Sequence, residues 1–448
     1  MLPTRALRDC LDGVIPGVVS TCAADGTPNV AYMSQGQYLD RQHLALSYQF
    51  FNRTRQNILA NPRATLGLIH PQTAQQYRVH LTYQRTETTG PVFESMKAKL
   101  AGIASHTGMS GVFRLLGSDI YRIDRVEVVP GSTVAAPAPA MDGLSALRAC
   151  MERLPASPDA ESLLDALLDG LLEHFAIEHA LVMMLDPGRS RLYTVASRGY
   201  ETSGVGSEIP LGEGVIGVAA RERVPIRISH MTSEYAYGRA MREGAEQRGL
   251  GDLLETAIPF PGLAAPGSQL AVPIPGAREP IGVLFVESPS DMRFSHADED
   301  ALVALATQVG GLFRLFLAEL ELGEETQPAT GQPPHPEGAP LRVRHYPAND
   351  SVFLGDDYLI KGVAGSILWT LLKDHQALGR TQFSNRELRA DPRVRLPDQS
   401  DNLEARLVLL HRRLAEHRAC VQMEKTGRGR FRLVVDRPLE LEDMDPGA

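Results

Sequence analysis

Arginines are concentrated in a part of the N-terminal third that contains no acidic residue. Between Asp40 and Glu87 there is no Asp or Glu, although the whole chain has 54 Asp and Glu against 45 Lys and Arg. The basic side chains inside this stretch are Arg41, Arg53, Arg55, Arg63, Arg78 and Arg85. A local field of this sign favours an anionic ligand. A helix that starts near Thr54 would add backbone N–H groups and so form a phosphate cradle. The alternative is that these arginines coat a solvated edge.

A second basic region lies near the C-terminus. From Leu341 to Arg437 there are about 18 Lys and Arg against about 12 Asp and Glu, which reverses the sign of the rest of the chain. Cations on a helix and on a following ribbon could meet DNA phosphates or the minor groove. These cations are Arg406, Arg412, Arg413, Lys425, Arg428 and Arg430. The acids Asp398, Asp401 and Glu404 at the start of that helix would oppose binding, so a protein-interaction module is the alternative.

No residue pattern indicates a catalytic residue or a metal site. The four cysteines, Cys10, Cys22, Cys150 and Cys420, form no C-x-x-C pair and no zinc-ligand spacing. We expect reduced thiols. The histidines of the first third have no acid/base partner that the sequence reveals, so we predict surface or strand positions for them.

Length and composition indicate a multidomain globular protein. The chain has 448 residues, enough for two to four domains, and 43% of them are hydrophobic. No run approaches the ~20 apolar residues of a membrane span, and the N-terminus lacks the apolar core of a signal peptide. We therefore expect no membrane partner and a cytoplasmic location.

Two Pro-rich stretches divide the chain. VVPGSTVAAPAPAMDG and EETQPATGQPPHPEGAP read as linkers. The predicted boundaries are a first domain at 1–131, a linker at 132–142, a second domain at 143–322, a Pro-rich linker at 323–340, a third domain at 341–437 and an acidic tail at 438–448.

The periodicity of hydrophobic residues predicts a mixed α+β fold. Short alternating runs such as HLALSYQF and YRVHLTYQRTET predict a small β-barrel with helices at its edges. In the middle third, the helical ESLLDALLDGLLEHF and the strands HALVMMLD and GVLFVES predict a central antiparallel sheet covered by helices. The last third predicts a strand hairpin, three helical segments and a terminal ribbon.

The first third resembles the FMN-binding split barrel of the pyridoxamine 5′-phosphate oxidase family. The resemblance rests on DGTPNVAYMS followed by LALSYQFFNRTRQNILANPRATLGLI, with Asn57, Asn61, Pro62 and Arg63 at matching places. One departure is Thr54, where the family commonly has Lys. The resemblance implies bound FMN, with haem or no cofactor as alternatives, and a cofactor site formed by Ser47, Asn52, Arg53, Thr54, Arg55 and Asn57.

The middle third is similar to GAF domains. The segments IPLGEGVIGVAARERVPIRIS, SQLAVPIPGAREPIGVLFVES and MRFSHADEDALVALATQVG stand in the family's order. This resemblance implies an α/β sandwich with a small-molecule pocket, for which the candidates are His230, Tyr235, Tyr237 and Arg239. A GAF domain that only dimerises is the alternative.

The last third resembles the winged helix-turn-helix of response-regulator transcription factors. Trp369, Arg412, Arg413, Leu414, Gly427, Gly429 and Phe431 occupy the places of its buried aromatic, recognition helix and wing. The resemblance implies double-stranded DNA as a partner.

The three resemblances together predict a transcriptional regulator that responds to a ligand or to redox state. We expect a homodimer that senses a small-molecule effector through the barrel and the GAF domain and reads DNA through the winged helix. The alternative is an enzyme, an FMN-dependent oxidoreductase or a haem-binding split barrel, in which the other two domains are regulatory.

Overall fold

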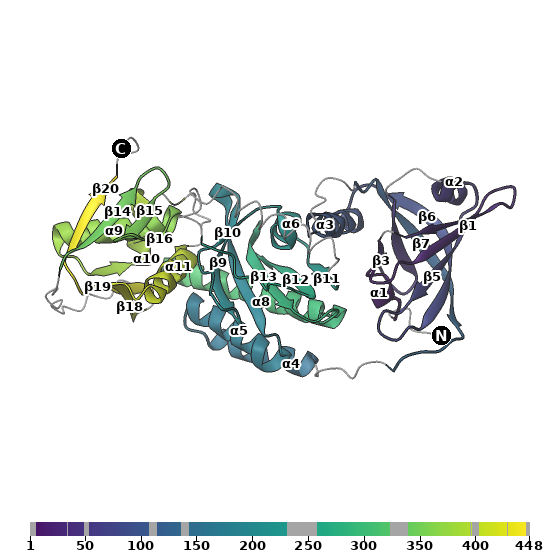
Figure 1. The fold of residues 1–448 in the computed structure, drawn as a ribbon, viewed down its shortest axis with the longest axis horizontal. Helices are drawn as coiled ribbons and strands as arrows, with labels where there is room; N and C mark the ends of the chain where they lie inside the picture. Colours follow the sequence, from purple (N-terminus) through teal and green to yellow (C-terminus); the bar gives the residue numbers. More distant parts are fainter. Residues whose placement is uncertain are drawn as a thin grey trace.

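The chain forms three domains that follow one another in space as they do in the sequence (Figure 1). This computed structural model describes residues 6–444 except 34, 49–52, 107–113, 136–142, 231–257, 323–338, 395, 397–402 and 428. Within the described residues, no helix has both the length and the apolar character needed to cross a bilayer.

The first domain is a seven-stranded antiparallel sheet that curves into a half-barrel, with strand order β2-β1-β5-β6-β7-β4-β3. Alternating burial along the strands places leucines and valines inside the curve and polar residues outside. The strands are Val18–Cys22 (β1), Pro28–Tyr32 (β2), Gly36–Tyr38 (β3), His43–Tyr48 (β4), Arg63–Ile69 (β5), Gln76–Glu87 (β6) and Gly117–Val129 (β7). The helices are Leu7–Cys10 (α1), Arg53–Ala60 (α2) and Pro91–His106 (α3). The predicted α+β barrel with edge helices is confirmed.

The second domain is a six-stranded antiparallel sheet between helices, in the order β10-β9-β8-β13-β12-β11. Helices pack on both faces, so β8 and β13 are buried almost throughout. The strands are His179–Asp186 (β8), Arg191–Arg198 (β9), Glu208–Pro210 (β10), Ile226–Ile228 (β11), Ser268–Pro275 (β12) and Pro280–Ser288 (β13). The helices are Gly143–Arg153 (α4), Ala160–Phe175 (α5), Gly214–Glu222 (α6) and His296–Leu322 (α8), with short 3-10 turns at Leu154–Ala156 and Pro187–Arg189. The predicted central antiparallel sheet is confirmed.

Helix α5 shows how the sequence sets a boundary. Asp159 caps its N-terminus by accepting a hydrogen bond from the Ser162 backbone N–H at 2.9 Å. Leu163, Leu167 and Leu171 recur at helical spacing and are fully buried. The helix ends where Ala176 adopts the left-handed conformation.

The third domain joins two small sheets around three helices. One sheet has the order β16-β15-β14-β20 and the other β17-β19-β18. The strands are Leu341–Tyr346 (β14), Ser351–Leu354 (β15), Asp357–Ile360 (β16), Gln382–Ser384 (β17), Val421–Gly427 (β18), Arg430–Val435 (β19) and Leu439–Asp443 (β20). The helices are Gly362–Leu378 (α9), Asn385–Ala390 (α10) and Leu403–Glu416 (α11), with a 3-10 turn at Pro392–Val394. The predicted hairpin, three helices and ribbon are all present in this order.

The predicted acidic tail at 438–448 is wrong as far as residue 443. Leu439–Asp443 forms β20, which pairs in parallel with β14 from Leu341↔Leu439 to His345↔Asp443. The alternation Leu439-Glu440-Leu441 has the period of a strand, which outweighs the acidic composition of the segment.

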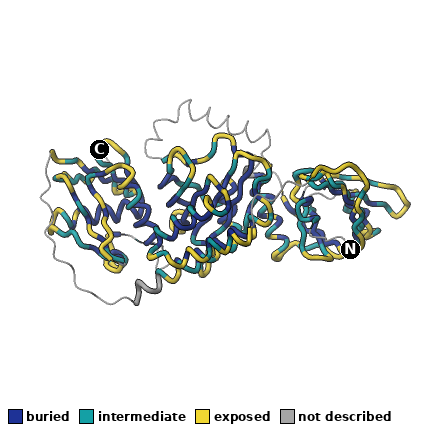
Figure 2. The backbone as a smooth tube through the Cα atoms, turned by 90° about the horizontal axis from the view of Figure 1, so that it is seen from below, coloured by how far each residue is buried: buried dark blue, intermediate teal, exposed yellow. Residues whose placement is uncertain are grey.

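Buried residues form a continuous path from the second domain into the third (Figure 2). One apolar cluster contains Leu171 and Tyr193 of the second domain together with Leu409 and Leu410 of α11. The first domain has a separate core around Leu66 and Val79. The second and third domains thus share one apolar core, in addition to the linker that connects them.

Candidate functional site

The predicted phosphate cradle lies around α2, where some of the predicted residues are exposed and others hold the helix to the sheet. Arg53 is exposed in the first turn of the helix. Thr54 Oγ1 accepts a hydrogen bond from Asn29 Nδ2 at 2.9 Å, and Asn57 Nδ2 donates to Thr21 Oγ1 at 3.1 Å. Thr54 and Asn57 therefore fasten α2 to strands β1 and β2. Asn52 lies outside the described residues.

Arg55 is neutralised by a carboxylate inside the barrel. Its Nη1 lies 2.5 Å from Asp119 Oδ1, and their side chains are 12% and 7% exposed. Arg55 also donates to Thr86 Oγ1 at 2.8 Å and lies over the ring of Tyr48 at 4.6 Å. Burial raises the pKa of Asp119, against the opposing effects of Thr86 and Arg55. A phosphate beside Arg55 would face this acid, so Arg53 suits a phosphate better than Arg55 does.

Buried polar atoms without a hydrogen-bond partner gather at the β3/β4/β7 side of the barrel. Ser47 pairs in register with Ser118, and the Ser47 N–H donates to the Gln35 backbone oxygen at 2.9 Å. Within the part of the chain that the structure describes, the atoms without a partner are Gln35 Oε1, Gln37 Oε1, Ser47 Oγ and Ser118 Oγ. Because an unmet buried polar group costs free energy, this side of the barrel fits a polar ligand. Ser47 was predicted to be in the site, whereas Gln35, Gln37 and Ser118 were not.

A polar depression of about 540 Å³ opens beside β1, β5, β6 and β7. It is lined by Arg63, His80, Arg122 and Asp124, among others. Arg122 Nε donates to Asp124 Oδ1 at 2.8 Å, and His80 lies 3.4 Å from a Glu127 oxygen. Arg122 and His80 thus have acidic partners in the barrel, which weakens the depression as an anion site.

The predicted ligand residues of the GAF-like domain are only partly described. His230 is exposed and lies 3.1 Å from Asp291. Tyr235, Tyr237 and Arg239 lie outside the described residues.

A buried polar cluster that the sequence did not predict lies at one end of the same sheet. Glu287 is 2% exposed, and its Oε1 and Oε2 accept hydrogen bonds from the Leu263 N–H at 2.8 Å and from Gln269 Nε2 at 3.1 Å. Burial and Glu287 raise the pKa of Tyr200, whose ring meets His179 edge-on. An acid among the apolar residues of GVLFVES was the signal that could have found this cluster. Carboxylate, amide and phenol together can bind a polar small molecule.

Three of the predicted DNA-binding cations contact acids of the middle domain. Arg406 Nη2 lies 2.9 Å from Asp186 Oδ2, with its guanidinium 4.2 Å from the centre of the Tyr193 ring. Arg412 Nη2 lies 2.9 Å from Asp165 Oδ1. Lys425 Nζ lies 2.9 Å from Asp159 Oδ2 and 2.8 Å from Glu161 Oε2.

The remaining predicted DNA-binding residues lie inside the third domain. Arg413 Nε donates to the Leu359 oxygen at 3.0 Å, and burial lowers the pKa of its guanidinium. Arg430 is half-buried in β19, and Arg428 is outside the described residues. Glu404, expected to repel DNA, is buried and lies 3.1 Å from Arg389. This acid therefore does not project from the helix start, and contact of these cations with DNA stays a prediction.

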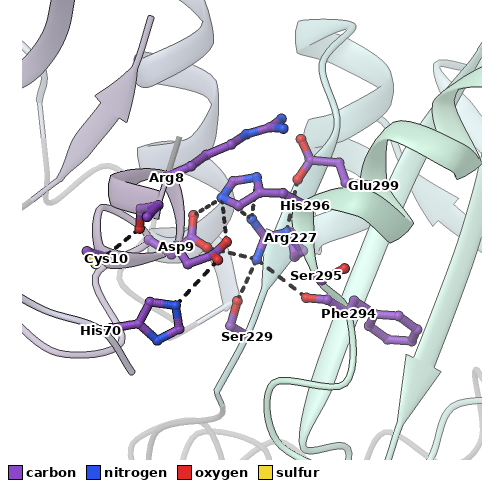
Figure 3. Close-up of polar contacts among 12 residues, drawn as sticks. Arg8, Asp9, Cys10, His70, Arg227, Ser229, Phe294, Ser295, His296 and Glu299 are labelled. Carbon is purple, nitrogen blue, oxygen red and sulfur yellow. Dashed lines mark hydrogen bonds and ion pairs between the residues drawn. The ribbon is translucent and has the colours of Figure 1, made fainter. Parts of the chain in front are cut away.

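An ion-pair cluster joins the first and second domains (Figure 3). Arg227 Nη1 lies 3.0 Å from Asp12 Oδ2, and its Nε lies 3.0 Å from Glu299 Oε2. His296 Nε2 lies 3.0 Å from Asp12 Oδ1 and 3.9 Å from Asp9. Asp9, Asp12 and His296 are close enough to share a cation. The guanidinium of Arg227 already supplies positive charge there, so we interpret the cluster as an interdomain contact.

The comparisons with known proteins match the first two domains. The family model described as pyridoxamine 5′-phosphate oxidase matches residues 3–119, and the GAF domain model matches residues 157–313. No curated protein matches the chain.

Solved structures resemble single domains of the chain. The GAF domain of an Acinetobacter phosphoenolpyruvate-protein phosphotransferase is 22% identical, covers 40% of this chain and 96% of its own, and has a TM-score of 0.31. An FMN-binding protein from Syntrophomonas wolfei is 14% identical, covers 29% and 90%, and has a TM-score of 0.25. Free methionine-R-sulfoxide reductase from Neisseria meningitidis, in complex with its substrate, is 18% identical, covers 40% and 95%, and has a TM-score of 0.31.

The two family matches agree with the folds of the domains that they cover. Residues 3–119 match the oxidase model on a half-barrel sheet, and residues 157–313 match the GAF model on an antiparallel sheet between helices. The chain thus combines a pyridoxamine 5′-phosphate oxidase-like split barrel with a GAF domain, a combination that suggests a sensory or regulatory protein.

Proposed function

We propose that this protein is a transcriptional regulator that senses a small molecule or redox state and binds duplex DNA through its C-terminal domain. The observation that carries the proposal is the basic face of α11 and β18. Arg406, Arg412 and Lys425 lie on this face, where each contacts a carboxylate of the GAF domain that a DNA phosphate could replace. The order of helices and ribbon in this domain supports a winged helix with α11 as its reading helix.

The split barrel would hold FMN as the redox-sensing group. Arg53 and the first turn of α2 would bind the phosphate, and Ser47, Ser118 and Gln35 would meet polar atoms of the flavin. When bound, the flavin supplies the redox chemistry, while these residues bind and orient it. Absorption bands near ~370 and ~450 nm in the purified protein would identify a flavin, and a Soret band would identify haem instead.

The GAF domain would bind the small-molecule effector at the cluster of Glu287, Gln269 and Tyr200. The protein would act as a homodimer. Edge strand β2 supports pairing, because Val30 and Tyr32 on it are 66% and 81% exposed.

DNA binding is tested by selecting duplexes from a random library with the full chain and with Glu161→Lys/Asp165→Lys. This variant removes carboxylates of the GAF domain and leaves every predicted DNA contact intact. Arg428→Ala/Arg430→Ala should then lower the magnitude of the log K against log salt slope by about two. If neither protein enriches any duplex at low salt, the chain does not bind DNA in the proposed way.

A further inference from the structure

Helix α11 is covered on the side that faces the GAF domain. Figure 1 shows it beside β9 and α5, between the two domains. Ten of its fourteen residues are buried, including Arg406 and Arg413. A reading helix must present one side to the major groove, and here that side meets protein.

The covering surface carries acids opposite Arg406, His411 and Arg412 of α11. Glu161 Oε1 lies 3.0 Å from His411 Nδ1 and 3.5 Å from Arg412 Nε, while its other oxygen meets Lys425. Asp165 and Asp186 meet Arg412 and Arg406. These carboxylates therefore contact the same cationic side chains that DNA phosphates would need. A duplex and the GAF domain cannot hold the same guanidiniums at once.

The contact between α11 and the GAF domain includes apolar packing as well as ion pairs. The apolar cluster runs without interruption from α5 and β9 into α11. At Gly206, an added Cβ would lie 3.7 Å from Leu409 Cδ1 and 3.7 Å from Arg413 Cδ. The backbone of the GAF domain therefore approaches α11 closely at this point.

We propose that the GAF domain inhibits DNA binding by holding α11 in this docked position. The inference rests on the proposed function, since it concerns the regulation of the same DNA-binding face. Binding requires the third domain to leave the acids Asp159, Glu161, Asp165 and Asp186. The Pro-rich sequence 323–340 between the two domains supplies about 18 residues of tether, roughly 60 Å when extended.

One short segment connects the buried polar cluster of the GAF domain to the docked helix. The segment 199–208 includes Tyr200, whose hydroxyl is buried without a hydrogen-bond partner among the described residues; burial and the Glu287 carboxylate raise its pKa. Farther along, Ser203 Oγ donates to Glu416 Oε1 at 2.5 Å, and Glu208 lies 3.1 Å from Lys361 Nζ. An effector that moves Tyr200 would act on both contacts with the third domain, which gives a route from ligand to release.

The docked state lowers the apparent DNA affinity by the fraction of molecules that are undocked. If one molecule in a hundred is open, the apparent Kd is about a hundredfold weaker than that of the free domain. We therefore expect Glu161→Lys/Asp165→Lys to bind a selected duplex at least about tenfold more tightly than the wild type at the same salt. The control is Glu173→Lys/Glu178→Lys, which changes the net charge equally at exposed acids that do not contact the third domain.

The experiment measures two quantities on the full chains. Fluorescence anisotropy gives the affinity for the duplex, and hydrogen exchange of residues 403–416 reports whether α11 is docked. Faster exchange with tighter binding in the interface variant alone supports the inhibition. Unchanged exchange in the interface variant shows that these acids do not hold the helix and overturns it.

The other outcomes separate the inference from the proposed function. Faster exchange with equal affinity in the wild type and the variant overturns the inhibition and leaves DNA binding standing. Faster exchange with no DNA binding in any protein overturns the proposed function, and the inhibition falls with it. Equal tightening by the control variant assigns the effect to net charge and also overturns the inhibition.

Discussion

Arg406 of α11 and Asp186 of the GAF domain form an ion pair that is almost completely excluded from solvent. The atoms Nη2 and Oδ2 are 2.9 Å apart, and the side chains are 5% and 6% exposed. The ring of Tyr193 lies against the guanidinium and closes the pair off. An isolated charge left in such a place cannot be hydrated.

Asp186→Asn should therefore destabilise the docked domains by about 3–5 kcal/mol, since it removes a buried carboxylate that forms an ion pair with Arg406. Denaturant unfolding of the full chain measures the change. The matched control is Glu152→Gln in the pair Arg148–Glu152, whose side chains are 72% and 64% exposed. We expect this control to change stability by less than about 1 kcal/mol. Equal effects of the two substitutions would contradict the role of Asp186.

Arg53 and Arg55 should behave differently when each is replaced by Ala. Arg53→Ala removes an exposed cation and should reduce FMN retention while leaving the unfolding midpoint unchanged. Arg55→Ala leaves Asp119 buried without its partner and should lower the free energy of unfolding by about 3–5 kcal/mol. Flavin absorbance per chain and denaturant unfolding separate the two effects.

The double variant Arg55→Ala/Asp119→Asn is the control for this prediction. Removing both charges should restore part of the stability that the single substitution loses, because no uncompensated buried charge remains. Full flavin retention in Arg53→Ala would remove Arg53 from the phosphate site.

Docking of the third domain should weaken in acid because of Glu161. Although burial opposes it, hydrogen bonds from His411 and Lys425 lower the pKa of Glu161 from 4.5 to about 2. The stabilisation is thus fully present above about pH 4.5 and is lost as the pH falls toward 2. A difference of this size corresponds to roughly 3 kcal/mol.

Hydrogen exchange of residues 403–416, corrected for intrinsic rates, should therefore rise as the pH falls through this range. The titratable and charged neighbours are Arg412 and His411 on α11, Lys425 on β18, and Asp159 and Asp165 beside Glu161. Glu161→Gln should already exchange fast at pH 6 and show a flatter pH dependence. A wild-type profile that is as flat as that of the variant would contradict the assignment.

Glu287→Gln should alter α11 although the residue lies outside the contact with the third domain. The substitution removes the carboxylate charge that acts on Tyr200, and residues 199–208 connect Tyr200 to Ser203 and Glu208. We expect exchange of residues 403–416 to become several-fold faster. Glu279→Gln, at an exposed acid paired with Arg223, is the control. Identical exchange in both variants would show that the segment does not couple the two places.

The sequence predicted helices and strands well where the spacing of apolar residues is regular. ESLLDALLDGLLEHF has leucines at helical spacing, and the structure has helix α5 at Ala160–Phe175. The basic helix RTRQNILA was likewise found as α2. Such signals depend on neighbouring residues, so the position of a helix can be predicted without knowing its contacts with distant residues.

The sequence could not show which partner each charge takes. Arg55 finds Asp119 64 residues away, and Arg412 finds Asp165 247 residues away. Because these partners are brought together only by the fold, cations counted as ligand contacts proved to be engaged within the protein. Glu287 was missed for the same reason, since only packing shows that its carboxylate is buried.

The pairing of β20 with β14 also determines which strand forms the open edge of that sheet. A chain ending after Arg437 would lack β20, and the backbone N–H and C=O groups of β14 that face it would become an open edge. Open edges of this kind recruit strands from other chains. Leu439–Asp443 therefore moves the edge of this sheet onto a short acidic strand, and a short, charged edge disfavours edge-to-edge aggregation.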